Sequence, residues 1–187
     1  MTHATLTAPA GTAVWKLDPS HAHVEFAVRH LMISKVRGQF TDVAGTLAIE
    51  NDDISTARLD VEIRATSVDT RVEQRDEHLR SADFLDVDRF PTLSFRSKRV
   101  ERTDRKRLRV AGDLTIRDLT REIALDVTER GTVTDPWGGE RAGYEASVTI
   151  NRKDFGLTWN QALEAGGLLV GDEVEITLDA EWILQSE

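Results

Sequence analysis

The chain has 187 residues, enough for one ordinary domain with a substantial core, and 40% of them are hydrophobic while 30% are charged. It contains no cysteine, so disulfides, thiolate metal sites and cysteine nucleophiles are excluded. The net charge of -9 argues against a general nucleic-acid-binding protein, which needs clustered positive charge to meet phosphates.

The N-terminal segment is not typical of an exported or membrane-anchored protein. It lacks a charged region followed by a continuous apolar run, and no segment approaches the roughly 20 apolar residues of a membrane span. We therefore expect a cytoplasmic protein. Small and polar residues, with Pro9 and Gly11, fill the first dozen positions, so residues 1–13 are expected to form a flexible tail and residues 14–187 a single domain.

The segment HAHVEFAVRH, residues 21–30, predicts a strand because apolar and polar residues alternate in it. The apolar parity directs Phe26, Val28 and His30 toward the interior. Ala27 falls on the opposite parity and is expected to face water.

This segment holds three of the five histidines of the chain, which raises the question of a metal site. His21 and His23 share the polar face of the strand, whereas His30 lies on the other face. A zinc site needs three or four ligands directed at one point, and nothing nearby in the sequence completes one around His21 and His23. We therefore expect no metal, two surface histidines, and a His30 that is either a core residue or part of a cavity wall.

The same alternation recurs along the whole chain, at residues 59–65, 108–117, 122–127, 144–150 and 173–182. Strands with one apolar and one polar face are typical of antiparallel sheets. About eight such strands must close or stack, because open sheet edges promote aggregation. The sequence therefore predicts an all-β protein, an antiparallel barrel of about eight strands, whose interior can hold one small ligand.

Residues 72–81 interrupt the alternation and consist of good helix formers, so a short helix is expected there. Thr70 and Glu73 have the spacing of a capping box. Val72 and Leu79 are expected on the inner side of this helix, and His78 in solvent. A helical turn is also expected at residues 161–164.

Two further groups of residues have alternative interpretations. The basic run between Arg96 and Arg109 could be a docking patch for anionic lipid headgroups, but a solvated hairpin end explains it better. The phenylalanines and Trp159 near strand ends are either ordinary core or, as a set, the lining of a ligand cavity.

No sequence motif of a known catalytic mechanism is present: there is no nucleophile elbow, P-loop or zinc-protease motif. Carboxylates are plentiful, but nothing places two of them in one cleft. We therefore expect a protein that is not an enzyme and needs no cofactor.

Four stretches, in order, resemble the YceI-like family of lipid-binding proteins: LDPSHAHVEFAVRH, RDEHLRSADFLDVDRFPTLSFRS, AGDLTIRDLTREIALDV and INRKDFGL, followed by VGDEVEITLDAEW. The resemblance implies an extended lipocalin-like antiparallel barrel. It also implies binding of a long isoprenoid lipid, such as an isoprenoid quinone or a polyprenyl chain, in the barrel lumen, with His30 a possible contact for a polar head.

The expected partner is thus an apolar lipid, with a homodimer possible and nucleic acid excluded. The alternatives are an enzyme acting on a small hydrophobic or isoprenoid substrate, and a packed barrel that serves as an interaction module. No catalytic or metal-binding residue is expected. The residues expected to line the ligand site are Phe26, Val28, His30, Phe40, Ile63, Phe84, Phe95, Ile116, Phe155 and Trp159.

Overall fold

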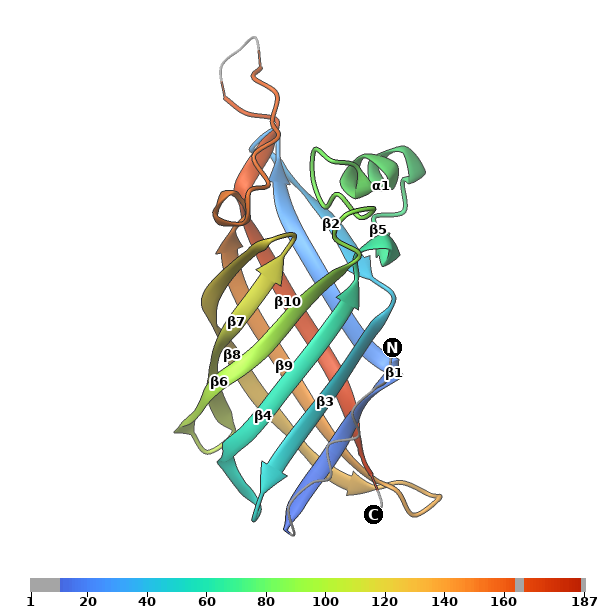
Figure 1. Cartoon of the computed structure of the whole chain (residues 1–187), viewed down its shortest axis with the longest axis vertical. Coiled ribbons are helices and arrows are strands. Elements are labelled where there is room, and N and C mark those ends of the chain that lie inside the picture. The colour runs from blue at the N-terminus through green and yellow to red at the C-terminus, as the bar shows by residue number, and fades with distance from the viewer. Residues whose placement is uncertain (1–10, 164–166, 186–187) are drawn as a thin grey trace.

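The alternating pattern of the sequence becomes the inner and outer faces of a closed antiparallel sheet (Figure 1). The computed structural model describes residues 11–163 and 167–185. Hydrogen bonding between the first and last strands closes the ring. The strands of this barrel are, in order, β1 (Thr12–His30), β3 (Val43–Glu50), β4 (Asp53–Arg64), β6 (Thr92–Asp104), β7 (Arg107–Ile116), β8 (Leu119–Thr134), β9 (Glu140–Asn151) and β10 (Val170–Leu184).

Strand β1 runs the full height of the barrel and changes partner on one side. Its residues 12–16 pair with β3, and its residues 24–30 pair with β2 (Ser34–Phe40). The two-residue strand β5 (Val68–Asp69) extends the sheet beyond β2. Because the barrel begins at Thr12, the last two residues of the expected tail belong to β1, and residues 1–10 lie outside the described residues.

The expected helix is present as α1 (Glu73–Arg80), which lies at the end of the barrel where β1 meets β2 (Figure 1). The capping-box prediction was wrong, because the N-cap is Val72 and no side chain caps it. Thr70 instead donates its backbone N–H and its hydroxyl to the buried Asp76, at 2.9 and 2.5 Å. Val72 is 46% exposed, so its predicted inward position was also wrong.

Arginine side chains attach α1 to the barrel, since the helix is too polar to do so by apolar packing. Arg75 donates to the hydroxyl and the carbonyl of Thr70, at 2.7 and 2.9 Å. Arg80 donates to the carbonyls of Thr66 and Val68, in and just after the 3-10 helix η1 (Ala65–Ser67). No helix in the described ranges is long and apolar enough to cross a membrane.

A second helical turn is present, but it lies earlier in the sequence than the predicted one. It is the 3-10 helix η2 (Arg152–Phe155), which ends at Gly156 with a left-handed φ of 72°. Of the stretch predicted to be helical, residues 161–163 are not, and Ala162 forms a β-bridge with Leu168. Glu164 lies outside the described residues.

The residues of β1 face the lumen and the outside in the predicted alternation, but the outer face is less exposed to solvent than expected. Ala27 is only 6% exposed, yet it does not belong to the apolar core cluster. It pairs with Arg37 on one side and Glu175 on the other, and long charged side chains of this kind cover small neighbours with their apolar stems. The expectation that Ala27 faces water was therefore wrong, although it does lie outside the lumen.

The basic run at residues 96–109 belongs to the hairpin of β6 and β7, and acidic residues of neighbouring strands pair with several of its members. Arg96 contacts Asp60 at 2.9 Å, and Lys98 contacts Asp113 at 2.6 Å. These pairs favour the solvated hairpin over a docking patch.

Candidate ligand-binding site

A cavity of about 340 Å³ occupies the half of the barrel lumen nearest α1. Its volume lies within the range of small-molecule sites. Inward-facing side chains of most barrel strands form its wall, and they are mainly aliphatic or aromatic. Nine of the ten residues expected at the ligand site line this cavity: Phe26, Val28, His30, Phe40, Ile63, Phe84, Phe95, Ile116 and Trp159.

Phe155 is the exception among the expected residues. It is the last residue of η2, is only 2% exposed, and packs in the core instead of lining the cavity. Parity could not place it, because a residue in a 3-10 turn does not follow the alternation of a strand.

The buried Arg152 organises the segment that brings Trp159 to the cavity. Its guanidinium donates to the carbonyls of Gly171 (2.8 Å), Leu157 (2.5 Å) and Trp159 (2.9 Å). Burial lowers the pKa of Arg152, and the nearby Asp172 opposes that shift. An arginine that is satisfied by carbonyls in this way acts as a structural tie and has little capacity left to bind a ligand.

Three aromatic rings pack against one another at the α1 end of the cavity. His78 lies edge-on to Phe84 and Trp159, with ring centroids 5.0 and 4.6 Å away, and Phe84 lies 5.4 Å from Trp159. The other side of the imidazole reaches Asp83, with Nε2 2.9 Å from a carboxylate oxygen. The expectation that His78 lies in solvent was therefore wrong, because this ring is half-buried and lines the cavity.

Polar side chains are few on the described cavity wall and gather at this same end. Besides the two structural arginines, Arg75 and Arg152, they are His78 of α1 and His30 of β1. Glu25 and Arg29 of β1 also touch the cavity, but both are exposed and lie on the outer parity of the strand. His30 is half-buried and points to the lumen side of β1, as its parity predicted. The arrangement thus offers a ligand a long apolar surface and a polar edge at one end.

A second cavity of about 90 Å³ lies further down the barrel, away from α1. Its wall includes Trp182, Leu47 and the partly buried Tyr144. Five residues line both cavities and so form a waist between them: Val24, Leu59, Val61, Leu125 and Leu178. The lumen is therefore divided into a large upper and a small lower chamber.

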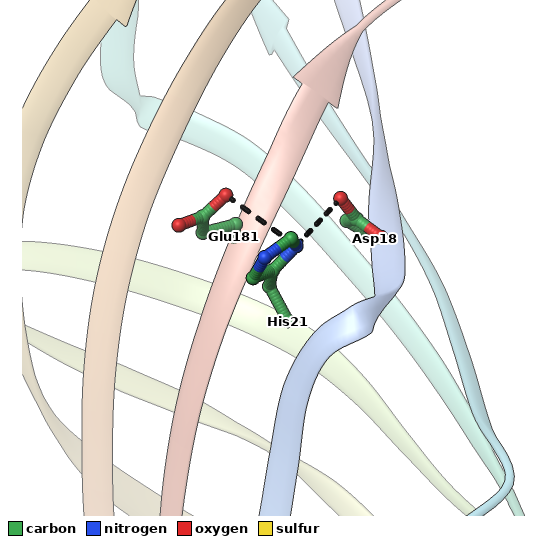
Figure 2. Close-up of side chains that lie close together, drawn as sticks. All are labelled: Asp18, His21 and Glu181. Carbon is green, nitrogen blue, oxygen red and sulfur yellow. Dashed lines mark hydrogen bonds and ion pairs between the residues drawn. The ribbon is translucent and has the colours of Figure 1, made fainter.

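Outside the lumen, three possible metal ligands lie together near the base of β1. Figure 2 shows His21 between Asp18 and Glu181, and the ligand atoms of all three lie within 4.8 Å of one another. No partner for a site built on both His21 and His23 is evident from the sequence; the structure instead groups His21 with Asp18 and with Glu181 of β10, which is far away in the sequence. His23 is not part of this group.

A guanidinium already holds the cation position of this cluster. Arg141 donates to Asp18 at 2.7 Å and to Glu181 at 3.1 Å, and its Nε donates to Asp135 at 2.9 Å. Hydrogen bonds from Arg141, and then from His21, lower the pKa of Asp18 to about 2. We therefore interpret the cluster as an ion-pair network that fastens β1 to β9 and β10.

Sequence reasoning missed part of the contribution that α1 and the segment after it make to the cavity wall. Leu79 of α1 lines it as its predicted inward position implies, but His78 of α1 and Leu85 of the following segment were not predicted there. No periodic signal identifies them, because a short polar helix does not reveal which side is covered. Other missed wall residues, such as Val148 and Ile176, lie on the parity already assigned to the interior and follow from the same rule.

Comparison with known proteins identifies the family. The model of the YceI-like domain matches residues 15–182. The chain belongs to the YceI family. Among curated YceI relatives, a UPF0312 protein of Staphylococcus aureus strain N315 is 39% identical over 168 residues, which cover 88% of this chain and 94% of the relative.

Solved structures agree with the YceI fold. The YCEI protein of Campylobacter jejuni superposes with a TM-score of 0.72 at 26% identity, and the match covers 100% of this chain and 98% of that one. BcnA of Burkholderia cenocepacia, at 16% identity, gives a TM-score of 0.77 and covers 88% of this chain and 98% of its own. A domain of Saccharophagus degradans, described as polyisoprenoid-binding, gives 0.67 at 14% identity over 91% of this chain and 98% of its own.

Proposed function

We propose that this YceI protein binds a long apolar lipid of the isoprenoid type, an isoprenoid quinone or a polyprenyl chain, in its lumen and carries it unchanged. The observation that carries this proposal is the cavity of about 340 Å³ with its mainly apolar wall. Transfer of apolar surface from water contributes roughly 25 cal/mol per Å², reduced by the cost of ordering a flexible chain.

The polar edge of the cavity supports a ligand with one polar head. His30 is half-buried beside an otherwise apolar chamber and offers a ring nitrogen to a quinone carbonyl or another polar group. The Saccharophagus degradans domain of the same fold, whose description names polyisoprenoid binding, supports the same class of ligand.

We infer a carrier and not an enzyme, since the wall offers mostly apolar contact. A packed interaction module is disfavoured by the size of the cavity. A cytoplasmic location stays a prediction, and the sequence leaves a homodimer open.

The test compares two adjacent positions of β9 that face opposite sides. Val148 lines the cavity, whereas Thr149 is exposed on the outer face. Val148→Asn puts an amide on an apolar wall where no polar group replaces the water hydrogen bonds that it loses, which costs about 1–3 kcal/mol, so bound lipid should fall. Thr149→Asn adds the same side chain to the surface and should change stability by no more than about 0.5 kcal/mol.

The measurement is native mass spectrometry of the purified protein, followed by solvent extraction and identification of the released lipid. We expect a co-purifying isoprenoid in the parent and in Thr149→Asn, and much less in Val148→Asn. A parent protein that contains no lipid and takes up no added isoprenoid quinone would contradict carriage.

A further inference from the structure

The turn that joins β1 to β2 exposes three consecutive apolar side chains. Leu31 is 36% exposed, Met32 62% and Ile33 81%. Exposed apolar side chains that adjoin one another, in contrast to ones scattered singly, are a feature of interaction surfaces. We call these three residues the turn tip.

The backbone conformation of the turn tip is one that favours glycine and asparagine over large apolar residues. Leu31 and Met32 both have positive φ, 52° and 60°, and the N–H of Ile33 donates to the carbonyl of His30 at 3.2 Å. Consecutive turn positions with positive φ favour Asn and Gly, because large side chains are strained there. Folding and solubility would thus both favour a different sequence at this point.

The flanks of the turn tip are basic in a chain whose net charge is -9. Residues 29–37 contain Arg29, Lys35 and Arg37 and no acidic residue. Glu175 of β10 pairs with Lys35 at 2.6 Å, and Arg29 and Arg37 also lower its pKa by their charge, so one carboxylate faces three basic side chains of this hairpin. Apolar side chains flanked by arginine and lysine are the pattern of a segment that binds anionic membrane surfaces.

The turn tip adjoins the end of the large cavity. The N–H of Leu31 donates to the carbonyl of Leu169 at 2.9 Å. Leu169 lines the cavity, as do Arg29 and His30, which immediately precede the tip. A surface in contact with the tip therefore lies next to the cavity wall.

We propose that the turn tip inserts its apolar side chains into the surface of an anionic lipid bilayer, with Arg29 and Arg37 against the headgroups. This surface is additional to the lumen, and its assignment does not require that the lumen holds a lipid. It would place the α1 end of the barrel against the membrane.

The opposite end of the barrel supplies a matched control. The end of β8 and the turn to β9 expose Val133 (64%) and Trp137 (86%), but this end has no basic excess, because Asp135 pairs with Arg141 and Glu140 adds an acidic residue. In Figure 1 this turn lies at the far end from α1. It therefore has exposed apolar side chains without the charge that would attract anionic lipid.

The experiment is co-sedimentation with vesicles of phosphatidylglycerol and phosphatidylcholine, and with phosphatidylcholine alone. The parent should bind the anionic vesicles more strongly, and less so as salt is raised. The double variant Met32→Gly with Ile33→Ser should bind the anionic vesicles at least about tenfold more weakly than the parent. Its melting temperature should not fall, because glycine adopts the positive φ of position 32 without strain. Val133→Ser with Trp137→Ser should bind as the parent does.

Weaker vesicle binding without a lower melting temperature separates a loss of docking from damage to the fold. Should the tip variant fail to fold, Arg37→Gln tests the same surface and should weaken binding to anionic vesicles alone. The proposal is overturned if the parent binds neither vesicle, if the control variant loses as much binding as the tip variant, or if sedimentation velocity shows a dimer that only the tip variant loses.

Lipid content, measured on the same samples, tests the lumen independently. A tip variant that keeps its bound lipid but loses vesicle binding supports both proposals. A parent that binds vesicles yet contains and takes up no isoprenoid leaves the docking surface standing while carriage fails.

Discussion

Asp18 is a buried carboxylate, and such a group is costly unless charge and hydrogen bonds compensate it. It lies in a bulge of β1, where the pairing with β10 shifts between Leu17 and Ala22. Its oxygens accept from the backbone N–H of Ser20 at 3.0 Å and from Arg141 at 2.7 Å. This single side chain therefore holds the bulge and also ties β1 to β9, which lies beyond β10 in the sheet.

The pKa of Asp18 predicts how stability changes in acid. Arg141 lowers it to about 2, whereas an unfolded aspartate titrates near 3.9. The stabilisation is therefore complete above about pH 4 and is lost as the pH falls toward 2, by about 1–2 kcal/mol after solvent screening is allowed for. Other carboxylates also titrate there, so the measurement is the difference in unfolding free energy between the parent and Asp18→Asn. This difference should shrink between pH 4 and pH 2, and a constant difference would contradict the assignment.

The strands β1 and β2 meet closely at one glycine. Gly38 pairs with Phe26, and a Cβ built on Gly38 would lie 2.4 Å from Cζ of that ring and 2.8 Å from Cγ2 of Thr70. The ring of Phe26 therefore lies across the glycine and continues toward Phe40, 5.7 Å away. The absence of a side chain at Gly38 leaves room for an aromatic wall at the upper chamber.

Gly38→Ala should disturb this wall. The added methyl forces the Phe26 ring to move, at a cost of about 1–3 kcal/mol for overpacking, and bound lipid should decrease. In a Phe26→Leu background the same substitution should cost distinctly less, because the smaller side chain leaves space. A double-mutant cycle of urea midpoints measures this coupling, and additive effects would show that the two residues do not compete.

The waist between the two chambers matters at the scale of the whole barrel. Leu178 contributes to both chambers from β10, and its partners in the waist come from three other strands. A chain that extends from the upper chamber of about 340 Å³ into the lower one of about 90 Å³ must pass these side chains. In the proposed carrier, the waist would therefore limit how long a ligand the lumen accepts.

Opposite changes at Leu178 should shift ligand length in opposite directions. Leu178→Ala widens the waist and should favour longer isoprenoid chains, at a cost near the low end of 2–5 kcal/mol because the side chain already faces a cavity. Leu178→Phe narrows it and should favour shorter chains. Mass spectrometry of lipids taken up from an equal mixture of chain lengths gives the answer. Shifts in the same direction for both variants would rule out a role for the waist.

The barrel and most of its cavity wall could be predicted from the sequence because a strand repeats every two residues. That period assigns each side chain of a strand to the inside or the outside, and it placed Phe26, Val28 and His30 correctly on the cavity side. It fails where the chain leaves the strand, as at Phe155 and His78, and it cannot show how long side chains cover a small residue such as Ala27.

The sequence by itself determined an antiparallel barrel with an apolar interior and its family, since both rest on local pattern and on motifs in order. Only the tertiary structure decided what joins residues far apart in the chain. Arg141 and Glu181 meet Asp18 because β9, β10 and β1 are neighbours in the closed sheet, and His78 meets Trp159 because arginines fasten α1 and the segment after η2 over the same end. Strand periodicity carries no information about such encounters, which depend on how the ring closes and on which loops fold over its end.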